Sequence, residues 1–190
     1  MTPVLGDFTE PLRLPEGGAS GARLGFFPGS TLGNFTPDAA VGFLTGAKRL
    51  LGPEARLLIG VDLVKDEAPL VRAYDDEEGV TAAFNKNLLV RINHELRGSF
   101  ALDAFDHRAV WNRGEQRVEM HLVSRVAQTV AIGAAGITVA FECGEHIWTE
   151  SSYKYQPDRI ERMAVETGFG VRDQWIDDDA QFALSLMTAI

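Results

Sequence analysis

Two short stretches of the sequence carry polar side chains at positions suited to binding a small molecule. The first is the turn from Gly29 to Asn34, which follows a short apolar run at 24–27 and precedes a predicted helix. Glycines in such a turn let the main chain approach a ligand closely, and the serine, threonine and asparagine side chains supply hydrogen-bonding groups. The second is the pair Glu150 and Ser152, whose spacing in an extended segment places both side chains on one face.

The turn at 29–34 differs from two well-defined catalytic turns. A P-loop has four residues between its glycines and then Gly-Lys-Ser/Thr, whereas three residues separate Gly29 from Gly33 and no lysine follows. A nucleophile elbow has a glycine two positions before its serine, where this sequence has Pro28. The turn alone leaves two alternatives, a ligand-binding turn at the carboxyl end of a strand and a turn shaped only by packing.

The histidines and the acidic runs lack the spacing of a metal site. No two histidines form a His-Glu-x-x-His pair, and His94 is followed by Glu95 without the second histidine. The acidic runs at 75–78 and 177–179 lack the spaced ligands and the closing glutamate of a calcium loop. We therefore expect no metal ion in the functional site.

Composition limits the partners of the chain. Its 190 residues carry a formal net charge of −9, which argues against nucleic acid or an anionic membrane as the main partner. The single cysteine, Cys143, excludes a disulfide within the chain and fits a reducing compartment, so we expect a cytoplasmic protein. The first residues lack the apolar segment of a signal peptide, and the charge-free run at 126–141 is too short to cross a bilayer.

The two ends of the chain have an α/β pattern. Predicted strands and helices follow one another at 24–27, 37–51, 56–62, 157–167, 171–176 and 182–187. The last two are strands joined by a short turn, so they must be antiparallel.

The middle of the chain has a different pattern. Helices are predicted at 68–74 and over a longer segment whose apolar positions are 80, 84, 88, 92 and 96. From 105 to 152 the pattern becomes short strands, and Arg117 to Leu122 alternates as an antiparallel strand with one wet face does. We interpret this block as an insertion that packs over the sheet.

Several longer segments, including both candidate stretches, resemble the histidine Nα-methyltransferases of ergothioneine biosynthesis, which use S-adenosylmethionine (SAM). The resemblance is carried, in order, by "FFPGSTLGNF" (26–35), "LLIGVDLVKD" (57–66), "RAYDDEEGVTAAFNKNLL" (72–89), "INHEL" (92–96), "FALDAFDHRAVWN" (100–112), "RVEMHLVSR" (117–125) and "TESSYKY" (149–155).

The resemblance implies the second half of a class I SAM-dependent methyltransferase fold. This is a Rossmann-like α/β sheet with an inserted α+β substrate-binding subdomain. Residues 1–64 would form the partial Rossmann-like domain, 65–154 the insertion, and 155–190 the closing helix and antiparallel strands. The implied reaction is the SAM-dependent Nα-methylation of L-histidine to trimethylhistidine (hercynine).

The resemblance also implies which residues bind the substrate. Asn34 and Tyr74 would hold the amino and carboxylate groups of L-histidine, Glu150 and Ser152 would bind its imidazole, and Met120 would line the ring pocket. Methyl transfer to an amine mainly requires orientation, so we assign no catalytic residue. Taken singly, Tyr74 could instead be a half-buried aromatic, Glu150 a solvated strand charge and Ser152 a turn residue.

On the cofactor side the resemblance is incomplete. Asp7 and Phe8 would face the adenine of SAM, with Gly29 in the adjoining turn. The Gly-x-Gly turn of the family is absent, because the tract Gly17 to Gly21 precedes a strand instead of following one. The ribose-binding acid and the family's amino-terminal substrate-binding tyrosine are absent as well.

Two hypotheses follow from this mixture. The chain is the carboxy-terminal part of the methyltransferase and needs an amino-terminal half, or it is a non-catalytic amino-acid-binding or structural module. Its expected partners are L-histidine and either the missing half or a second copy that associates through the exposed sheet edge at 24–27.

Overall fold

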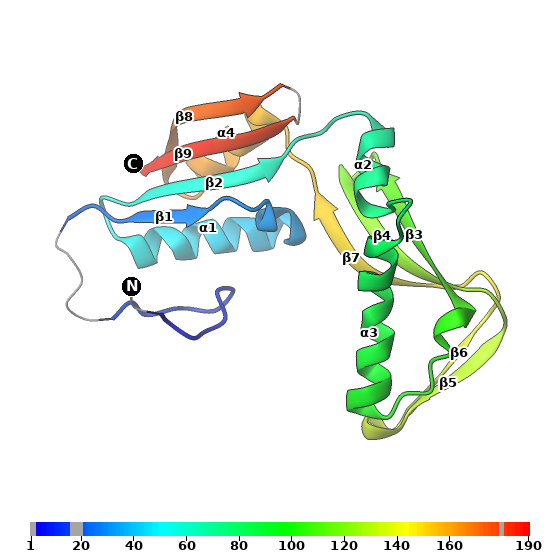
Figure 1. Cartoon of the computed structure of the whole chain (residues 1–190). Coiled ribbons are helices and arrows are strands. Elements are labelled where there is room, and N and C mark those ends of the chain that lie inside the picture. The colour runs from blue at the N-terminus through cyan, green and yellow to red at the C-terminus, as the bar shows by residue number, and fades with distance from the viewer. Residues whose placement is uncertain (1–2, 16–20, 179–180) are drawn as a thin grey trace. The chain divides into compact units, whose positions relative to one another are not determined.

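The computed structural model describes residues 3–15, 21–178 and 181–190, and the chain divides into two compact units (Figure 1). Unit 1 consists of the chain up to Val64 together with Tyr153–Ile190, and unit 2 is Lys65–Ser152. Most of the glycine-rich tract at 17–21 lies outside the described residues. Among the described helices, none combines the length and the apolar character that crossing a membrane requires.

Unit 1 is built on a four-stranded sheet of order β1-β2-β9-β8. β1 (Leu24–Phe27) pairs in parallel with β2 (Arg56–Asp62), which pairs antiparallel with β9 (Phe182–Ala189). β9 in turn pairs antiparallel with β8 (Phe169–Asp177), so the predicted antiparallel pairing of the last two strands is confirmed.

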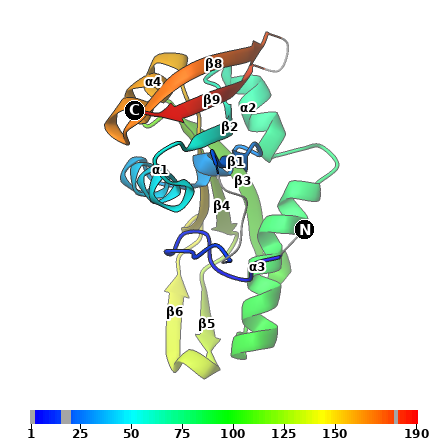
Figure 2. The ribbon, with the colours of Figure 1, turned by 90° about the vertical axis from the view of Figure 1, so that its left-hand side faces the viewer.

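Two helices contact one another on one side of this sheet (Figure 2). α1 (Pro37–Leu51) begins as the sequence predicts, since the Thr36 hydroxyl accepts a hydrogen bond from the Ala39 amide at 3.3 Å. It ends at Gly52, whose φ of 92° is a conformation that glycine adopts readily. α4 (Pro157–Glu166) likewise begins with a proline.

The core of unit 1 lies between the helices and the sheet. Leu44 of α1, Ile59 of β2, Ile160 of α4 and Met187 of β9 are fully buried in one cluster. β1 forms an edge of the described sheet, and its Phe26 side chain is 69% exposed. Among the described residues, β1 therefore pairs with β2 on one side and with no strand on the other.

Unit 2 contains a three-stranded sheet and a separate hairpin. The sheet has the order β3-β4-β7, with β3 (Phe105–Asn112), β4 (Arg117–Ser124) and β7 (His146–Tyr153), whose last residue belongs to unit 1. The hairpin joins β5 (Gln128–Ile132) to β6 (Ile137–Phe141). The predicted change from helices to strands in this part of the chain is confirmed.

Helices pack on the strands of unit 2. α2 (Glu67–Tyr74) contacts β3 and β4, and α3 (Val80–Leu96) contacts β3, β4 and β5. Short 3-10 turns complete the secondary structure, η1 (Thr31–Asn34) in unit 1 and η2 (Leu102–Ala104) and η3 (Gly133–Ala135) in unit 2.

Most of the apolar positions that define α3 in the sequence do not lie on its buried face, Ile92 excepted. Val80 and Phe84 are 64% and 66% exposed, whereas Asn85 and Leu89 are almost completely buried. The rotation has a physical reason. The Asn85 amide nitrogen donates to Nδ1 of His107 at 3.0 Å and to the carbonyl of His121 at 3.3 Å, so it links this face of α3 to β3 and β4, while its Oδ1 has no partner among the described residues.

The second boundary lies two residues before the expected one. Tyr153 and Lys154, expected in the insertion, belong to unit 1. Tyr153 is buried in the unit 1 core, and the Lys154 ammonium lies 3.0 Å from the Asp62 carboxylate. These long-range contacts are not visible in the local sequence pattern.

Candidate functional site

The turn that follows β1 is fixed to the carboxyl end of β2. The Ser30 amide donates to the Gly60 carbonyl at 3.1 Å, and the Ser30 hydroxyl accepts from the Asp62 amide at 2.9 Å. Ser30, with φ of 58°, takes the left-handed conformation here, so Gly29 is not the residue that allows the bend. The glycine that the turn requires is Gly60, because a Cβ at that position would lie 2.0 Å from the Pro28 carbonyl oxygen.

Tyr155 holds the same turn from within the core. Its hydroxyl donates to the Leu32 carbonyl at 3.2 Å, and the side chain is 2% exposed. Burial raises the pKa of Tyr155 to about 12, so the hydroxyl stays protonated and remains a donor. Asn34 ends this 3-10 turn with its side chain exposed. Hydrogen bonds therefore fix the main chain at Ser30 and at Leu32, whereas the Asn34 side chain is exposed to solvent.

Asp62, at the carboxyl end of β2, connects two segments of unit 1. Its carboxylate pairs with the fully buried Lys154, and its main-chain carbonyl accepts from the Tyr155 amide at 3.0 Å. The residue thus joins the end of β2 to the segment where the chain re-enters unit 1.

The segment around Asp7 and Phe8 borders a groove in unit 1. The groove has a volume of about 980 Å³ and is lined by the segment from Phe8 to Pro15, by β1 and by α1. The Phe8 ring makes edge contacts with Phe27 at 5.8 Å and Phe43 at 6.3 Å between centroids. Asp7 is not among the lining residues of this groove.

The Asp7 carboxylate is engaged within its own turn. It accepts hydrogen bonds from the Thr9 hydroxyl at 2.6 Å and from the Thr9 amide at 2.8 Å. These bonds hold the pKa of Asp7 below its ordinary value, so the group is anionic at neutral pH.

Tyr74 and Ser152 meet in unit 2, although the sequence separates them widely. The Tyr74 hydroxyl donates to the Ser152 hydroxyl oxygen at 2.7 Å. Tyr74 is the last residue of α2, and its carbonyl lies 2.7 Å from Nε2 of the buried His107. His107 of β3 is itself contacted by Asn85 of α3, so these contacts fix the end of α2 against β3. The Tyr74–Ser152 bond joins that end to β7.

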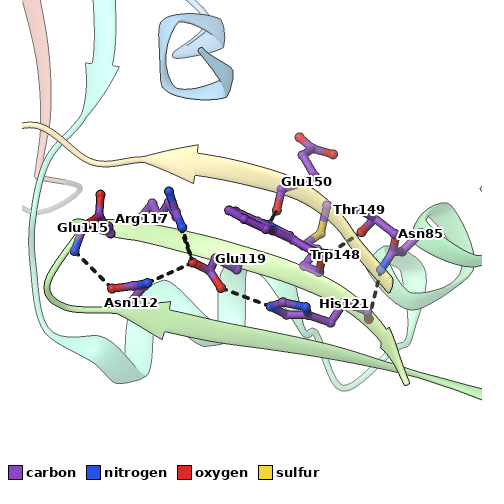
Figure 3. A network of polar contacts seen from close by, with 10 residues as sticks. Asn85, Asn112, Glu115, Arg117, Glu119, His121, Trp148, Thr149 and Glu150 are labelled. Atoms are coloured by element: carbon purple, nitrogen blue, oxygen red, sulfur yellow. Dashed lines mark hydrogen bonds and ion pairs between the residues drawn. The ribbon is translucent and has the colours of Figure 1, made fainter. Parts of the chain in front are cut away.

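Glu150 presents a half-buried carboxylate (Figure 3). Burial raises the pKa of this carboxyl, and no other residue contributes to the shift. Among the described residues, no side chain forms a hydrogen bond or ion pair with the carboxylate. The main-chain carbonyl of Glu150, in contrast, accepts a hydrogen bond from the Trp148 indole nitrogen at 3.0 Å. Glu150 therefore has a fixed main chain and a carboxylate available to a ligand.

Met120 is linked to the same strand. The side chain is 3% exposed, and its carbonyl accepts from the Thr149 hydroxyl at 2.9 Å. Tyr74, Met120, Glu150 and Ser152 thus belong to one unit, whereas Asn34, Asp7, Phe8 and Gly29 belong to unit 1.

Reasoning from the sequence missed the residues that support these side chains. His107 and His121 were considered only as metal ligands, and Asn85, Arg117 and Trp148 were not considered. The described residues contain no cluster of histidine, cysteine and acidic side chains that could hold a metal ion. A polar residue at a buried helix position, such as Asn85, is visible in a sequence only once the orientation of the helix is known.

The unit 2 residues can bind a flat, polar ring. The Glu150 carboxylate can accept an N–H, and the Ser152 hydroxyl oxygen accepts from Tyr74. Glu150 and Ser152 can therefore bind and orient a ligand. Within the described residues they do not form a nucleophile with an adjacent base, as covalent catalysis would need.

Comparison with known proteins gives a consistent result. The model of a family described as histidine-specific methyltransferase, SAM-dependent, matches residues 1–189. A histidine N-alpha-methyltransferase from Mycolicibacterium smegmatis is 46% identical over 184 residues, which cover 96% of this chain and 56% of that protein. Ergothioneine biosynthesis protein 1 from Neurospora crassa is 30% identical over 77% of this chain and 16% of its own length. The chain thus spans about half the length of the bacterial relative.

Among solved structures, the CcbJ methyltransferase from Streptomyces caelestis has a similar fold. It matches with a TM-score of 0.50 and 15% sequence identity, over 98% of this chain and 63% of that one. At this identity the likeness concerns the fold, which is that of class I SAM-dependent methyltransferases.

Proposed function

Because the chain belongs to the family of histidine-specific, SAM-dependent methyltransferases, we propose that it is the carboxy-terminal part of an enzyme that methylates the α-amino group of L-histidine. The product is trimethylhistidine (hercynine), and the reaction is a step of ergothioneine biosynthesis in the cytoplasm. The family match over residues 1–189 and the names of the bacterial and fungal relatives support this proposal.

The observation that carries the substrate assignment is the Glu150 carboxylate, which is half-buried and has no partner among the described residues. Neutral imidazole has one N–H donor and one acceptor nitrogen. In this proposal Glu150 accepts the N–H, and Ser152, whose hydroxyl oxygen accepts from Tyr74, contacts the other nitrogen. Met120 forms an apolar surface for the ring.

The amino group of the substrate requires orientation more than chemical activation. Asn34 and Tyr74 hold the amino and carboxylate groups of histidine, so that the neutral amine keeps its lone pair directed at the methyl group. The neutral form of the amine is the nucleophile, so the ammonium group of histidine first releases a proton to solvent. Each of the first two transfers is then followed by the loss of one further proton, and the third leaves a quaternary ammonium.

The residues present fit only the adenine edge of SAM. Phe8, packed on Phe27 and Phe43, offers an aromatic surface in a groove of about 980 Å³, and Asp7 and Gly29 adjoin it in our proposal. When bound, SAM supplies an electrophilic methyl group on a sulfonium. We propose that the ribose and methionine portions are held by an amino-terminal part that these residues do not include.

A second candidate function is a non-catalytic amino-acid-binding or structural module. The observation that favours it is the half-buried Glu150 carboxylate, which can bind a ligand without any methyl transfer. The enzyme and the amino-acid-binding module both predict histidine binding, whereas a structural module does not. Only the enzyme predicts methyl transfer once an amino-terminal part of a relative is added.

Calorimetric titration of L-histidine onto the chain tests the proposal. We expect binding that Glu150→Ala weakens about 10- to 100-fold, the loss expected for a hydrogen bond to a charged group. Glu161→Ala, which changes an exposed glutamate of α4, is the matched control and leaves binding unchanged. Equal affinity of the wild type and Glu150→Ala removes Glu150 from the site.

The same titration with SAM tests the cofactor side. We expect weak or undetectable binding, because most contacts to the ribose and the methionine are missing. Micromolar binding of SAM by residues 1–190 contradicts this expectation.

A further inference from the structure

The indole of Trp148 has several partners, among them the stacked His121 ring, although half of the side chain is exposed (Figure 3). The guanidinium carbon of Arg117 lies 4.4 Å from the centroid of the ring. At the ring edge, the indole nitrogen donates to the Glu150 carbonyl at 3.0 Å. A face contact and an edge contact together restrict both the tilt and the rotation of the ring.

Arg117 is itself fixed by a nearly buried carboxylate. Its guanidinium lies 2.8 Å from Oε1 of Glu119, and the two side chains are 15% and 13% exposed. Glu119 also accepts from the Asn112 amide at 2.9 Å and contacts Nε2 of His121 at 3.2 Å. The guanidinium therefore cannot swing into solvent without breaking an ion pair that is largely shielded from water.

The charge of Glu119 is maintained by its neighbours. Burial alone would raise the pKa of this carboxyl, but hydrogen bonds from Asn112, Arg117 and His121 outweigh burial and leave the pKa below its ordinary value. Glu119 thus stays anionic at neutral pH and holds Arg117 over the indole.

Core packing does not account for this arrangement. Trp148 is 51% exposed and lies outside both buried clusters of the described residues. Exposure alone does not account for it either, because an indole N–H at the surface can donate to water. Here it donates to the main chain two residues ahead, at the residue whose carboxylate has no partner among the described side chains.

We propose that Arg117 and Trp148 are positioning residues for Glu150. Glu119 anchors Arg117, Arg117 holds the indole, and the indole N–H fixes the main chain at Glu150, so that its carboxylate keeps a half-buried position. That the ligand of Glu150 is the imidazole of L-histidine rests on the proposed function. The effect of Arg117 and Trp148 on the position of the carboxylate does not depend on that function.

The test uses Trp148→Phe, which keeps a ring for Arg117 and removes the N–H. Trp175→Phe is the matched control, because Trp175 of β8 is 53% exposed and lies in unit 1. Arg117→Lys is a second variant that keeps a cation for Glu119 and loses the flat stacking surface. Cooperative thermal unfolding of each variant establishes that it is folded.

The first measurement needs no ligand. The carboxyl carbon of Glu150 is titrated by NMR in the 190-residue chain. We expect its pKa to fall toward the ordinary value in Trp148→Phe, and less so in Arg117→Lys, because the main chain at Glu150 loses one of the bonds that hold it and the carboxylate can then reach water. Trp175→Phe leaves the titration unchanged.

The second measurement is the affinity for L-histidine by calorimetry. We expect Trp148→Phe to weaken binding about five- to tenfold, the effect of one lost hydrogen bond, while Trp175→Phe binds as the wild type does. If no variant binds histidine but the Glu150 titration responds, the proposed function fails and the positioning role stands. An unchanged titration in folded Trp148→Phe and Arg117→Lys overturns the positioning role, whatever the affinity.

Discussion

The ammonium of Lys154 lies 3.0 Å from an oxygen of the Asp62 carboxylate, in a position where the lysine side chain is fully buried. Asp62 ends β2, and Lys154 directly follows β7. The pair therefore joins the two points of unit 1 between which unit 2 is inserted. A buried charge costs several kcal/mol when its partner is removed, roughly 3 to 5 in measured cases.

Asp62→Ala should accordingly destabilise unit 1 by about 3 kcal/mol, because it leaves the buried ammonium without this carboxylate. Urea denaturation measures the change. The control is Arg162→Ala, which removes an ion pair with Asp158 whose side chains are 70% and 59% exposed and should change little. Equal effects of the two variants would show that burial does not distinguish the pairs.

Gly60 should tolerate no side chain. Gly60→Ala places a Cβ 2.0 Å from the Pro28 carbonyl, so we expect a loss of about 1 to 3 kcal/mol and a displaced turn at 29–34. Gly46→Ala is the opposite case, because this helical position has open space around it and should gain up to about 1 kcal/mol. Chemical denaturation measures the free energy of unfolding of both variants. An unchanged value for Gly60→Ala would contradict the close approach of Gly60 to the Pro28 carbonyl.

Glu150 should lower the free energy of unfolding at neutral pH, where its half-buried carboxylate is charged. Its pKa is raised by burial above the ordinary 4.5, so the folded state holds the proton to a higher pH than the unfolded state. Stability therefore falls as the pH rises from the unfolded pKa through the folded pKa. Glu150→Gln should raise the Tm at pH 7 and leave it unchanged at pH 4. A variant that is less stable than the wild type at pH 7 would disprove this.

The exposed edge of the unit 1 sheet should promote self-association. Phe26 of β1 is 69% exposed on an edge strand, and such edges pair with other chains. Phe26→Lys should shift the chain toward monomers in light scattering across a concentration series. Val165→Lys, at an apolar position of α4 that is 63% exposed, is the control. A wild type that stays monomeric at every concentration contradicts the prediction.

Local signals in the sequence identified most of the elements. Thr36, Pro37 and Gly52 define α1 because capping chemistry is contained within a few neighbouring residues. The rotation of α3 could not be predicted in the same way. It depends on Asn85 meeting His107 and the His121 carbonyl, and these contacts exist only after the strands have formed.

In the candidate site, too, local features could be predicted from the sequence and long-range contacts could not. The spacing of Glu150 and Ser152 indicated a shared face, whereas the hydrogen bond from Tyr74 to Ser152 joins residues 78 positions apart. The bond from Tyr155 to Leu32 spans 123 positions. Resemblance selected residues that could contact a ligand, but it did not indicate those that hold them, such as Trp148 and Arg117.

The chain leaves unit 1 after Val64 and returns at Tyr153, and the two crossings are neighbours. Leu63 pairs in parallel with Tyr155, and the Val64 amide donates to the Tyr155 carbonyl at 2.9 Å. A segment whose two ends meet can be lengthened, shortened or exchanged without altering the register of β2 with β9. Changes in the length or sequence of residues 65–152 can therefore leave the strand pairing of unit 1 intact, so this segment can vary among related proteins while the sheet is kept.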